Sequence, residues 1–293
     1  MTTNKLLLRT VSTLVLIGCS FWWLYKASEN VFLVVTFGIA AVATWEYGNA
    51  IKKRGISLNR CALLFHTGLF FTVIWLQRNG LEIGAFAGIV MIALTMVRLS
   101  IANQYRTCSV IVWYLIPLFW IACPIGSLNY FRFSKAIETA SPLLLLLLMI
   151  VAGNDIFAYL GGKKFGRHVL ALTISPQKTV EGAIFGIVGG FVGALVSPVF
   201  FDVLSNIFIA DRASIQTMEL LNSWKIIVIV LTVVPIAQFS DLVESKFKRY
   251  CRIKDSSNFI PGHGGLLDRC DSYLLAIPTY YFVLLCMGIP FFL

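Results

Sequence analysis

Residues 140–161 read ASPLLLLLLMIVAGNDIFAYLG, an apolar run of membrane-spanning length that carries one carboxylate, Asp155, near its end. A helix needs about 20 apolar residues to cross a bilayer. The run is continuous, whereas half-buried helices and strands alternate apolar with polar positions. It therefore predicts a transmembrane helix, because hydrocarbon offers no hydrogen-bond partners and a spanning segment must satisfy its own backbone.

The rest of the chain has the same character. Of its 293 residues, 58% are hydrophobic and 13% are charged, and the mean hydropathy is +0.82. Soluble domains are about half apolar and about a quarter charged, so a soluble globular protein is excluded. The apolar runs are also too long for the alternating strands of a membrane barrel. We therefore expect an all-α, polytopic membrane protein that forms a single membrane domain over residues 1–293.

Apolar runs of about 17 to 25 residues predict about nine transmembrane helices. Their ranges are near 11–26, 31–49, 61–77, 82–97, 108–124, 140–161, 180–204, 224–242 and 272–293. The first run follows Lys5 and Arg9, and this pattern also fits a secretory signal peptide. We favour an uncleaved span, because Phe21, Trp22 and Trp23 are typical of the aromatic belt at a membrane interface.

The basic residues predict the orientation, since Lys and Arg concentrate in cytoplasmic loops. With a cytoplasmic N-terminus, 18 of the 24 basic residues fall inside. The six outside are Lys26, Arg78, Arg132, Lys135, Arg212 and Lys225. The net charge of +10 then lies almost wholly on the face that meets anionic headgroups. We expect a bacterial inner membrane protein whose active site faces the cytoplasm.

A face of small residues marks the seventh expected span. Gly182, Gly186 and Gly190 recur every four residues and Gly193 follows. Such a face lets another helix backbone approach closely. We expect packing within the chain, with a homodimer interface as the second interpretation.

The most informative segment is PGHGGLLDRCD at residues 261–271. Its glycines allow backbone N–H groups to point together at an anion. Asp268 and Asp271 are three residues apart and share one helical face, where a cation between them relieves their repulsion. Arg269 offers a planar fork for phosphate. His263 is a ligand, a proton relay or a structural hydrogen-bonder, and the sequence leaves these open.

Two more segments bring polar groups to the same cytoplasmic surface. Asp241 ends an apolar run, where an ionisable group indicates function. Asp241, Glu244, Ser245 and Lys248 share one helical face, although a salt-bridged helix end explains Glu244 equally well. The segment 175–182 is expected to be a turn that enters a helix and offers phosphate donors. Carboxylates beside Lys and Arg suit Mg²⁺ that bridges phosphates.

At these residues the sequence resembles the phosphatidate cytidylyltransferase (CDP-diacylglycerol synthase) family. The resemblance rests on two patterns, S-x-apolar-K-R-x4-K-D followed by P-G-H-G-G and apolar-x-D-R-x-D, and D-x-x-A-Y followed by S-P-K-K-T-x-E-G. The first is met by Ser245, Phe247, Lys248, Arg249, Lys254, Asp255, Pro261, Gly262, His263, Gly264, Gly265, Leu266, Asp268, Arg269 and Asp271. The second is met by Asp155, Ala158, Tyr159, Ser175, Pro176, Lys178, Thr179, Glu181 and Gly182.

The resemblance covers the C-terminal half, and the chain departs from the pattern at three positions. Gln177 stands where the family usually has Lys, Ser240 where it has Gly, and Cys270 where it has a larger apolar residue. Gln177 removes one cation from the expected phosphate loop. We assign the N-terminal spans, residues 1–135, to scaffold and lipid access, and residues 136–293 to catalysis.

The family implies that CTP and phosphatidic acid react to give CDP-diacylglycerol and pyrophosphate. The implied catalytic residues are Asp241, Lys248, Asp268, Arg269 and Asp271. The implied phosphate-binding residues are Ser175, Lys178, Thr179, Ser245, Arg249, Lys254, Gly262, His263, Gly264 and Gly265. The implied ligands of Mg²⁺, with a second monovalent or divalent cation beside it, are Asp155, Asp241, Asp268 and Asp271. The expected partners are CTP, phosphatidic acid and membrane lipids, and no nucleic acid.

Two alternatives stay open at this point. A transporter of a phosphorylated solute could use the same basic cluster, but transporters place polar groups near the membrane midplane. A related lipid nucleotidyltransferase or phosphotransferase acting on an isoprenoid substrate fits the same spacing.

Overall fold

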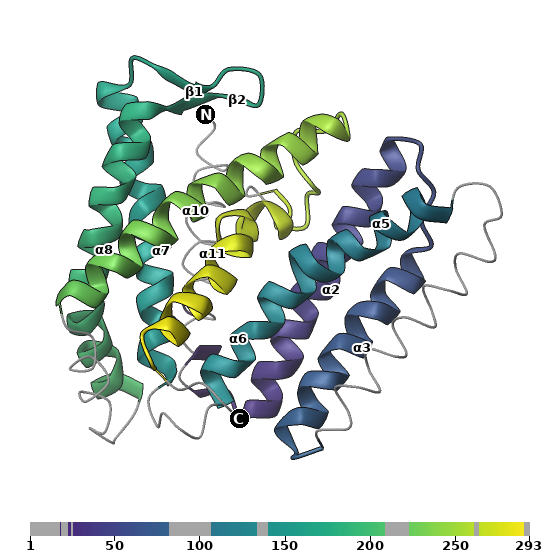
Figure 1. Ribbon diagram of the computed structural model, residues 1–293, viewed down its shortest axis with the longest axis horizontal. Coiled ribbons are helices and arrows are strands. Elements are labelled where there is room, and N and C mark those ends of the chain that lie inside the picture. Colours follow the sequence, from purple (N-terminus) through teal and green to yellow (C-terminus); the bar gives the residue numbers. More distant parts are fainter. Residues whose placement is uncertain are drawn as a thin grey trace.

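The structure of the chain, a computed structural model, describes residues 18, 23–24, 26–81, 107–133, 140–208, 223–260 and 264–289. This part of the chain is mostly helical (Figure 1). Its elements are α2 (Glu29–Lys53), α3 (Arg60–Arg78), α5 (Thr107–Pro117), η1 (Leu118–Ala122), α6 (Cys123–Phe133), α7 (Ala140–Phe165), β1 (Val169–Ala171), β2 (Ser175–Thr179), α8 (Val180–Phe208), α10 (Ser223–Tyr250) and α11 (Leu267–Cys286).

Six helical segments of the described residues are long and apolar enough to cross a membrane. They are Glu29–Lys53, Arg60–Arg78, Ile111–Arg132, Pro142–Phe165, Val180–Val203 and Trp224–Tyr250. The expected span at 272–293 corresponds to α11, which is not among the six. The expected span at 82–97 lies outside the described residues, as does most of 11–26. The number nine and the cytoplasmic N-terminus therefore stay predictions.

Two helices differ from the apolar runs that predicted them. α10 continues to Tyr250, beyond the expected end at residue 242, because Glu244 and Lys248 pair one turn apart and offset the loss of apolar character. The expected span at 108–124 is part of a longer irregular helix, α5–η1–α6. Pro117 and Pro124 each lack a backbone N–H, and the helix forms a π-helical turn between them.

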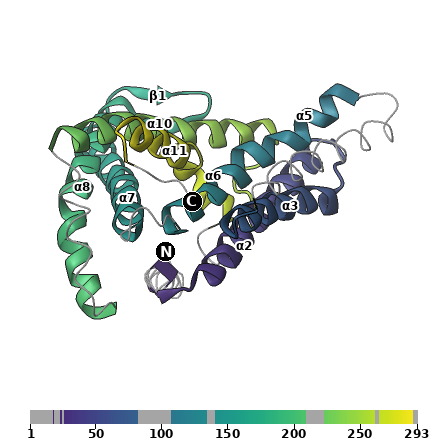
Figure 2. The same cartoon turned by 60° about the horizontal axis from the view of Figure 1, so that its bottom comes forward.

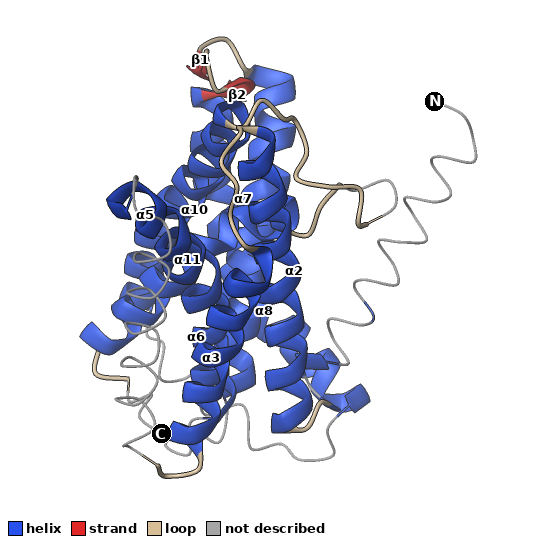
Figure 3. Ribbon diagram, turned by 90° about the vertical axis from the view of Figure 1, so that its right-hand side faces the viewer, coloured by secondary structure: helices blue, strands red, loops and turns tan. Residues whose placement is uncertain are grey.

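The described chain is mostly helical, as the all-α expectation held, but residues 169–179 form a short β-hairpin. The expected turn at 175–179 is a β-strand, β2, which pairs with β1 in an antiparallel hairpin. The hairpin connects α7 to α8 at one end of the bundle (Figure 3). Val180 N donates to the carbonyl of His168, and Thr179 Oγ1 accepts from Gly182 N at 3.1 Å. The hairpin thus ends in a side-chain cap for α8.

α7 and α8 lie side by side along their length (Figure 2). A Cβ at Gly193 would collide with the carbonyl oxygen of Met149, and Cβ atoms at Gly153 and Gly189 would each collide with the other's carbonyl. The glycine face expected on this helix therefore packs within the chain, as the first interpretation held. Small residues at such an interface bring two backbones together, and in lipid this packing replaces the hydrophobic effect as the main attraction.

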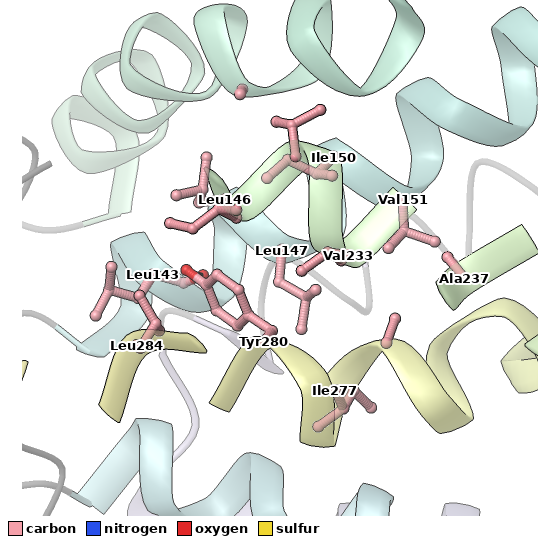
Figure 4. Close-up of a cluster of buried hydrophobic side chains, with 14 of the residues drawn as sticks. Leu143, Leu146, Leu147, Ile150, Val151, Val233, Ala237, Ile277, Tyr280 and Leu284 are labelled. Carbon is pink, nitrogen blue, oxygen red and sulfur yellow. Dashed lines mark hydrogen bonds between the residues drawn. The ribbon is translucent and has the colours of Figure 1, made fainter. Parts of the chain in front are cut away.

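The principal core lies among α7, α10 and α11 (Figure 4). It includes Leu143, Leu146, Leu147, Ile150, Val151, Val233, Ala237, Ile277, Tyr280 and Leu284. Tyr280 is fully buried, and its hydroxyl donates to the carbonyl of Leu143 at 3.0 Å, so its polar end is satisfied. This core fixes α11 against α7 and α10.

A second cluster joins the N-terminal helices to the C-terminal ones. Tyr47 of α2 stacks on Phe247 of α10, with ring centroids 5.1 Å apart. The Tyr47 hydroxyl donates to the carbonyl of Trp113. Leu267 and Leu274 of α11 belong to the same buried cluster. The two parts of the chain on either side of residue 135 therefore share a core.

The close approach of α7 and α8 leads to a test of stability. Gly193→Ala adds a methyl group against the Met149 carbonyl and should destabilise the fold by about 1–3 kcal/mol, the usual cost of overpacking. Gly38→Ala in α2 is the matched control, because a Cβ there meets nothing within 4 Å. Thermal denaturation in detergent should show a lower transition temperature for the first variant alone. Equal transition temperatures would contradict the packing described.

Candidate active site

A pocket of about 590 Å³ lies between α7, α8, α10 and the hairpin. Five of the predicted catalytic, phosphate-binding and metal-binding residues line it, namely Asp155, Ser175, Lys178, Thr179 and Asp241. Asp155 comes from α7, Asp241 from α10, and the other three from β2. The fold thus brings together two carboxylates and three donor side chains that lie far apart in the sequence.

Lys178 of β2 and Asp241 of α10 form an ion pair across this pocket. Both side chains are 27% exposed, but the ammonium nitrogen of Lys178 is itself buried. Arg249, further along α10, places its Nε 3.4 Å from the carbonyl oxygen of Ile174 in the hairpin. α10 therefore holds the hairpin at two points. Gln177, next to Lys178, is exposed and also lines the pocket.

Asp155 is oriented by two amide side chains that sequence reasoning missed. Asn154, 1% exposed, donates to Asp155 Oδ1 at 2.8 Å. Gln238 of α10 donates to Asn154 Oδ1 at 2.7 Å and to the carbonyl of Ala183 at 3.0 Å. The sequence did contain a signal for a role of these two residues, because Asn154 and Gln238 are polar side chains within apolar runs.

Ser272 lies between Asp155 and Asp271. Its hydroxyl is 3.4 Å from Asp155 Oδ2 and 3.5 Å from Asp271 Oδ1, and its N–H donates to Asp271 Oδ1 at 2.7 Å. Ser240, adjacent to Asp241, donates its hydroxyl to the backbone carbonyl of Asp271. The ends of α7, α10 and α11 therefore meet here, and three of the four predicted metal-binding carboxylates lie around this meeting point.

Asp268 makes different contacts. Its Oδ1 accepts from Lys248 Nζ at 2.8 Å, and its Oδ2 accepts from Ser256 N, Ser256 Oγ and Gly265 N at 2.9 Å each. Burial raises the pKa of Asp268, but the hydrogen bonds from Lys248, Gly265 and Ser256 and the charge of Lys248 outweigh burial. The pKa of Asp268 therefore lies below its ordinary value, and the ionised form is favoured.

Lys248 joins two carboxylates. Besides Asp268 it pairs with Glu244 at 2.6 Å, where the Glu244 side chain is fully buried. The salt-bridged helix end that was one interpretation of Glu244 is confirmed. Gly265 N–H, expected to point at an anion, donates to Asp268 in this structure. A Cβ on Gly265 would collide with Ser256 Oγ, so close packing requires glycine there.

Four of the other predicted residues lie within the part of the chain that the structure describes. Lys254 and Arg269 are exposed, and Ser245 is half-buried. Gly264 takes a positive φ of 85°, a conformation that favours glycine, and its carbonyl accepts from Ile260 N at 2.9 Å. Gly262 and His263 lie outside the described residues.

A residue of α2 also reaches this region. Glu46 is 2% exposed, and its carboxylate accepts from Ser256, Ser257, Leu266 and Leu267. Sequence reasoning assigned it no role, because the hydrogen-bonded partners lie more than 200 residues away.

The donor chemistry around Asp155, Asp241 and Asp271 fits a hard cation, since all three offer oxygen and none is paired with Cys or His. Across the residues that the structure describes, however, no three such side chains are close enough together to hold a metal ion as they stand. The ion pair of Lys178 with Asp241 occupies one of these carboxylates.

The chain is similar to proteins of one known family. The family model described as the cytidylyltransferase family matches residues 7–287. A phosphatidate cytidylyltransferase of Rickettsia bellii is 42% identical over 180 residues, which are 60% of this chain and 71% of that protein. Proteins of the same name from Haemophilus influenzae and Staphylococcus haemolyticus are 39% and 35% identical over 146 and 144 residues.

The aligned regions cover 46% of the Haemophilus protein and 49% of the Staphylococcus protein, so these matches span about half of the relatives' length. The family model covers most of the chain, including the N-terminal helices that lie outside the two sequence patterns. With the pocket, its carboxylates and its lysine in place, we conclude that the chain belongs to the cytidylyltransferase family.

Proposed function

We propose that this chain is a phosphatidate cytidylyltransferase, which converts CTP and phosphatidic acid into CDP-diacylglycerol and pyrophosphate. The observation that supports this most directly is the pocket between α7, α8 and α10, where Asp155, Asp241 and Lys178 converge. The names of the relatives support the same reaction. They do not favour the isoprenoid transferase or the transporter.

In the reaction, a phosphate oxygen of phosphatidic acid attacks the α-phosphorus of CTP. One P–O bond forms, the bond from the α-phosphorus to the bridging oxygen breaks, and pyrophosphate leaves with that electron pair. The attacking phosphate is already an anion near neutral pH, so no strong general base is needed. The work of the protein is therefore to position two anions and to stabilise the charge of the leaving group.

Different residues of the site have different proposed roles in the reaction. Lys178 lies where it can exchange Asp241 for a phosphate oxygen. Lys248, held by Glu244 and Asp268, supplies fixed positive charge beside the start of α11. Asn154 and Gln238 keep Asp155 in one orientation. We assign further phosphate contacts to Ser175, Thr179, Ser245, Arg249, Lys254, Arg269 and the glycine-rich turn with His263.

We assign the binding of Mg²⁺ to Asp155, Asp241 and Asp271, with Asp268 as the fourth predicted carboxylate. Mg²⁺, when bound, would neutralise phosphate charge and assist the departure of pyrophosphate. Asp268 already accepts from Lys248 and from the 256–265 segment, so a metal ion there would displace one of these donors. A second cation, monovalent or divalent, stays part of the proposal.

The proposed site faces the cytoplasm of a bacterial cell, from the inner membrane. The distribution of basic residues supports this orientation. The hairpin, the ends of α7 and α10 and the start of α11 carry most of the charged residues of the site at one end of the bundle. Soluble CTP and a membrane-embedded lipid could meet only at such an interface.

The reaction itself can be tested with the full-length protein purified in detergent. Labelled CTP, phosphatidic acid and Mg²⁺ should yield a labelled lipid and pyrophosphate in equal amounts, detected by thin-layer chromatography and a pyrophosphate assay. An isoprenoid phosphate acceptor is run in parallel. Labelled product with that acceptor alone would replace the proposal by the isoprenoid alternative.

The role of Asp268 is tested by Asp268→Asn, which keeps the shape and removes the charge. We expect turnover to fall by at least about 100-fold, because Lys248 loses one of its two carboxylate partners and the phosphates lose an organised site, while the protein stays in the membrane. Asp202→Asn, an exposed carboxylate of α8 outside the pocket, is the matched control. Retained turnover with an unchanged Mg²⁺ requirement would remove Asp268 from the metal site.

A substitution of Gln177 tests whether the binding of CTP can be strengthened. Gln177→Lys restores the cation that the family pattern has at this position of the pocket. One added charge about 4 Å from a phosphate in water is worth about 1 kcal/mol, so the KM for CTP should fall about fivefold at low salt. Gln177→Met, of similar length without charge, should leave the KM unchanged. Equal KM values for the two variants would show that residue 177 does not face the nucleotide.

A further inference from the structure

The buried carboxylate of Glu46 accepts hydrogen bonds from two segments in the C-terminal part of the chain. Oε2 accepts from Ser256 Oγ at 2.9 Å and from Leu267 N at 2.8 Å. Oε1 accepts from Ser257 Oγ at 2.5 Å and from Leu266 N at 3.0 Å. An ionised carboxylate is an acceptor only, so it suits all four donors, with the single hydroxyl hydrogen of Ser256 shared between Glu46 and Asp268.

These contacts replace a missing helix cap. The residue before α11 is Leu266, whose side chain makes no capping hydrogen bond. The first N–H groups of a helix have no partner inside it and carry the positive end of the helix dipole. Glu46 of α2 accepts from two of these groups, at Leu266 and Leu267. The start of α11 is thus held by a side chain of the N-terminal part of the chain.

Ser256 links Glu46 to the predicted catalytic residues. Its hydroxyl oxygen lies 2.9 Å from both Glu46 Oε2 and Asp268 Oδ2, and its N–H donates to Asp268. A Cβ on Gly265 would lie 2.7 Å from Glu46 Oε2. Glu46, Ser256 and Asp268 are therefore packed so closely that a shift of one displaces the others.

The end of α2 is itself held firmly. Tyr47, the next residue, is buried, stacks on Phe247 and donates to the carbonyl of Trp113. Phe247 immediately precedes Lys248, the partner of Asp268. Glu46 is therefore a fixed point against which both α10 and α11 are placed.

We propose that Glu46 is a positioning residue for cytidylyl transfer. By holding Ser256, Ser257 and the start of α11, it fixes Asp268 against Lys248 and, one turn further along, places Asp271 beside Asp155. This inference rests on the proposed function. It assigns to the N-terminal helices a part in the reaction beyond scaffold and lipid access.

The test is Glu46→Gln, which keeps the shape but turns one acceptor oxygen into an NH₂ donor that faces other donors. Because a small misplacement of reacting groups costs up to about 100-fold in rate, kcat should fall about 10- to 100-fold. The KM for CTP should change less than about threefold, since Lys178 and the hairpin lie outside the affected contacts. Backbone amide hydrogen exchange should become faster at Leu266 and Leu267 and stay unchanged at Leu274.

Thr36→Val in the same helix is the control for a purely structural effect. It removes another buried contact between helices, the 3.0 Å hydrogen bond from Asn129 to Thr36, away from the pocket. It should lower thermal stability while kcat stays within about twofold. If Glu46→Gln loses kcat only in proportion to stability, as Thr36→Val does, the proposal is overturned.

Ser257→Ala provides a second variant in case Glu46→Gln does not fold, because it removes one donor of the four. It should lower kcat by about two- to fivefold and speed exchange at Leu266. Unchanged kcat and exchange in Ser257→Ala would overturn the proposal as well. The exchange measurement needs no substrate, so it tests the contacts of Glu46 independently of the reaction. If the unmodified protein did not act on phosphatidic acid, the proposed function would be refuted, but the exchange result would still report on these contacts.

Discussion

The contact between α7 and α8 is the constraint on which the pocket depends. Glycines at 153, 189 and 193 allow each backbone to reach the carbonyl groups of the other. The connection between these helices is a short hairpin, so their approach also fixes where the hairpin lies. The position of the hairpin places Lys178 beside Asp241 of α10, where the two form an ion pair. A larger side chain at one of these glycines would move the hairpin as well as the two helices.

The charged groups of the site form two sets with different surroundings. Lys178, Asp155 and Asp241 line the pocket, and Lys178 is paired with Asp241. Behind it, Glu244, Lys248 and Asp268 are closely paired, and their partners are supplied by the protein itself. Under the proposed function, the first set binds and releases phosphates, whereas the second keeps its geometry. Asp271 and Ser272 lie between them.

Much of the helical fold followed from the sequence, because long apolar runs have one stable form in lipid. The end of α10 did not, since its last turns are charged and depend on the pair of Glu244 with Lys248. The hairpin was missed because a strand this short has little signal of its own, and its polar residues fit a turn equally well.

The candidate site, like the fold, was predicted only in part from the sequence. Asp155, Lys178 and Asp241 were predicted to meet because each ends an apolar run or lies in a basic loop, and all three line the pocket. Asn154 and Gln238 could have been found as polar residues within apolar runs. Glu46 could not have been paired with Leu266 and Leu267, because contacts across more than 200 residues depend on tertiary packing that no local pattern encodes.

The cap that α2 provides for α11 also has a consequence for biosynthesis. α2 is synthesised more than 200 residues before the start of α11, so the carboxylate of Glu46 has no access to its amide partners until that later segment emerges. Before then, the exposed amides at Leu266 and Leu267 would face water or lipid without their acceptor. Two fragments of this chain, synthesised separately, would have to associate in the bilayer before the last helix could begin in its native position.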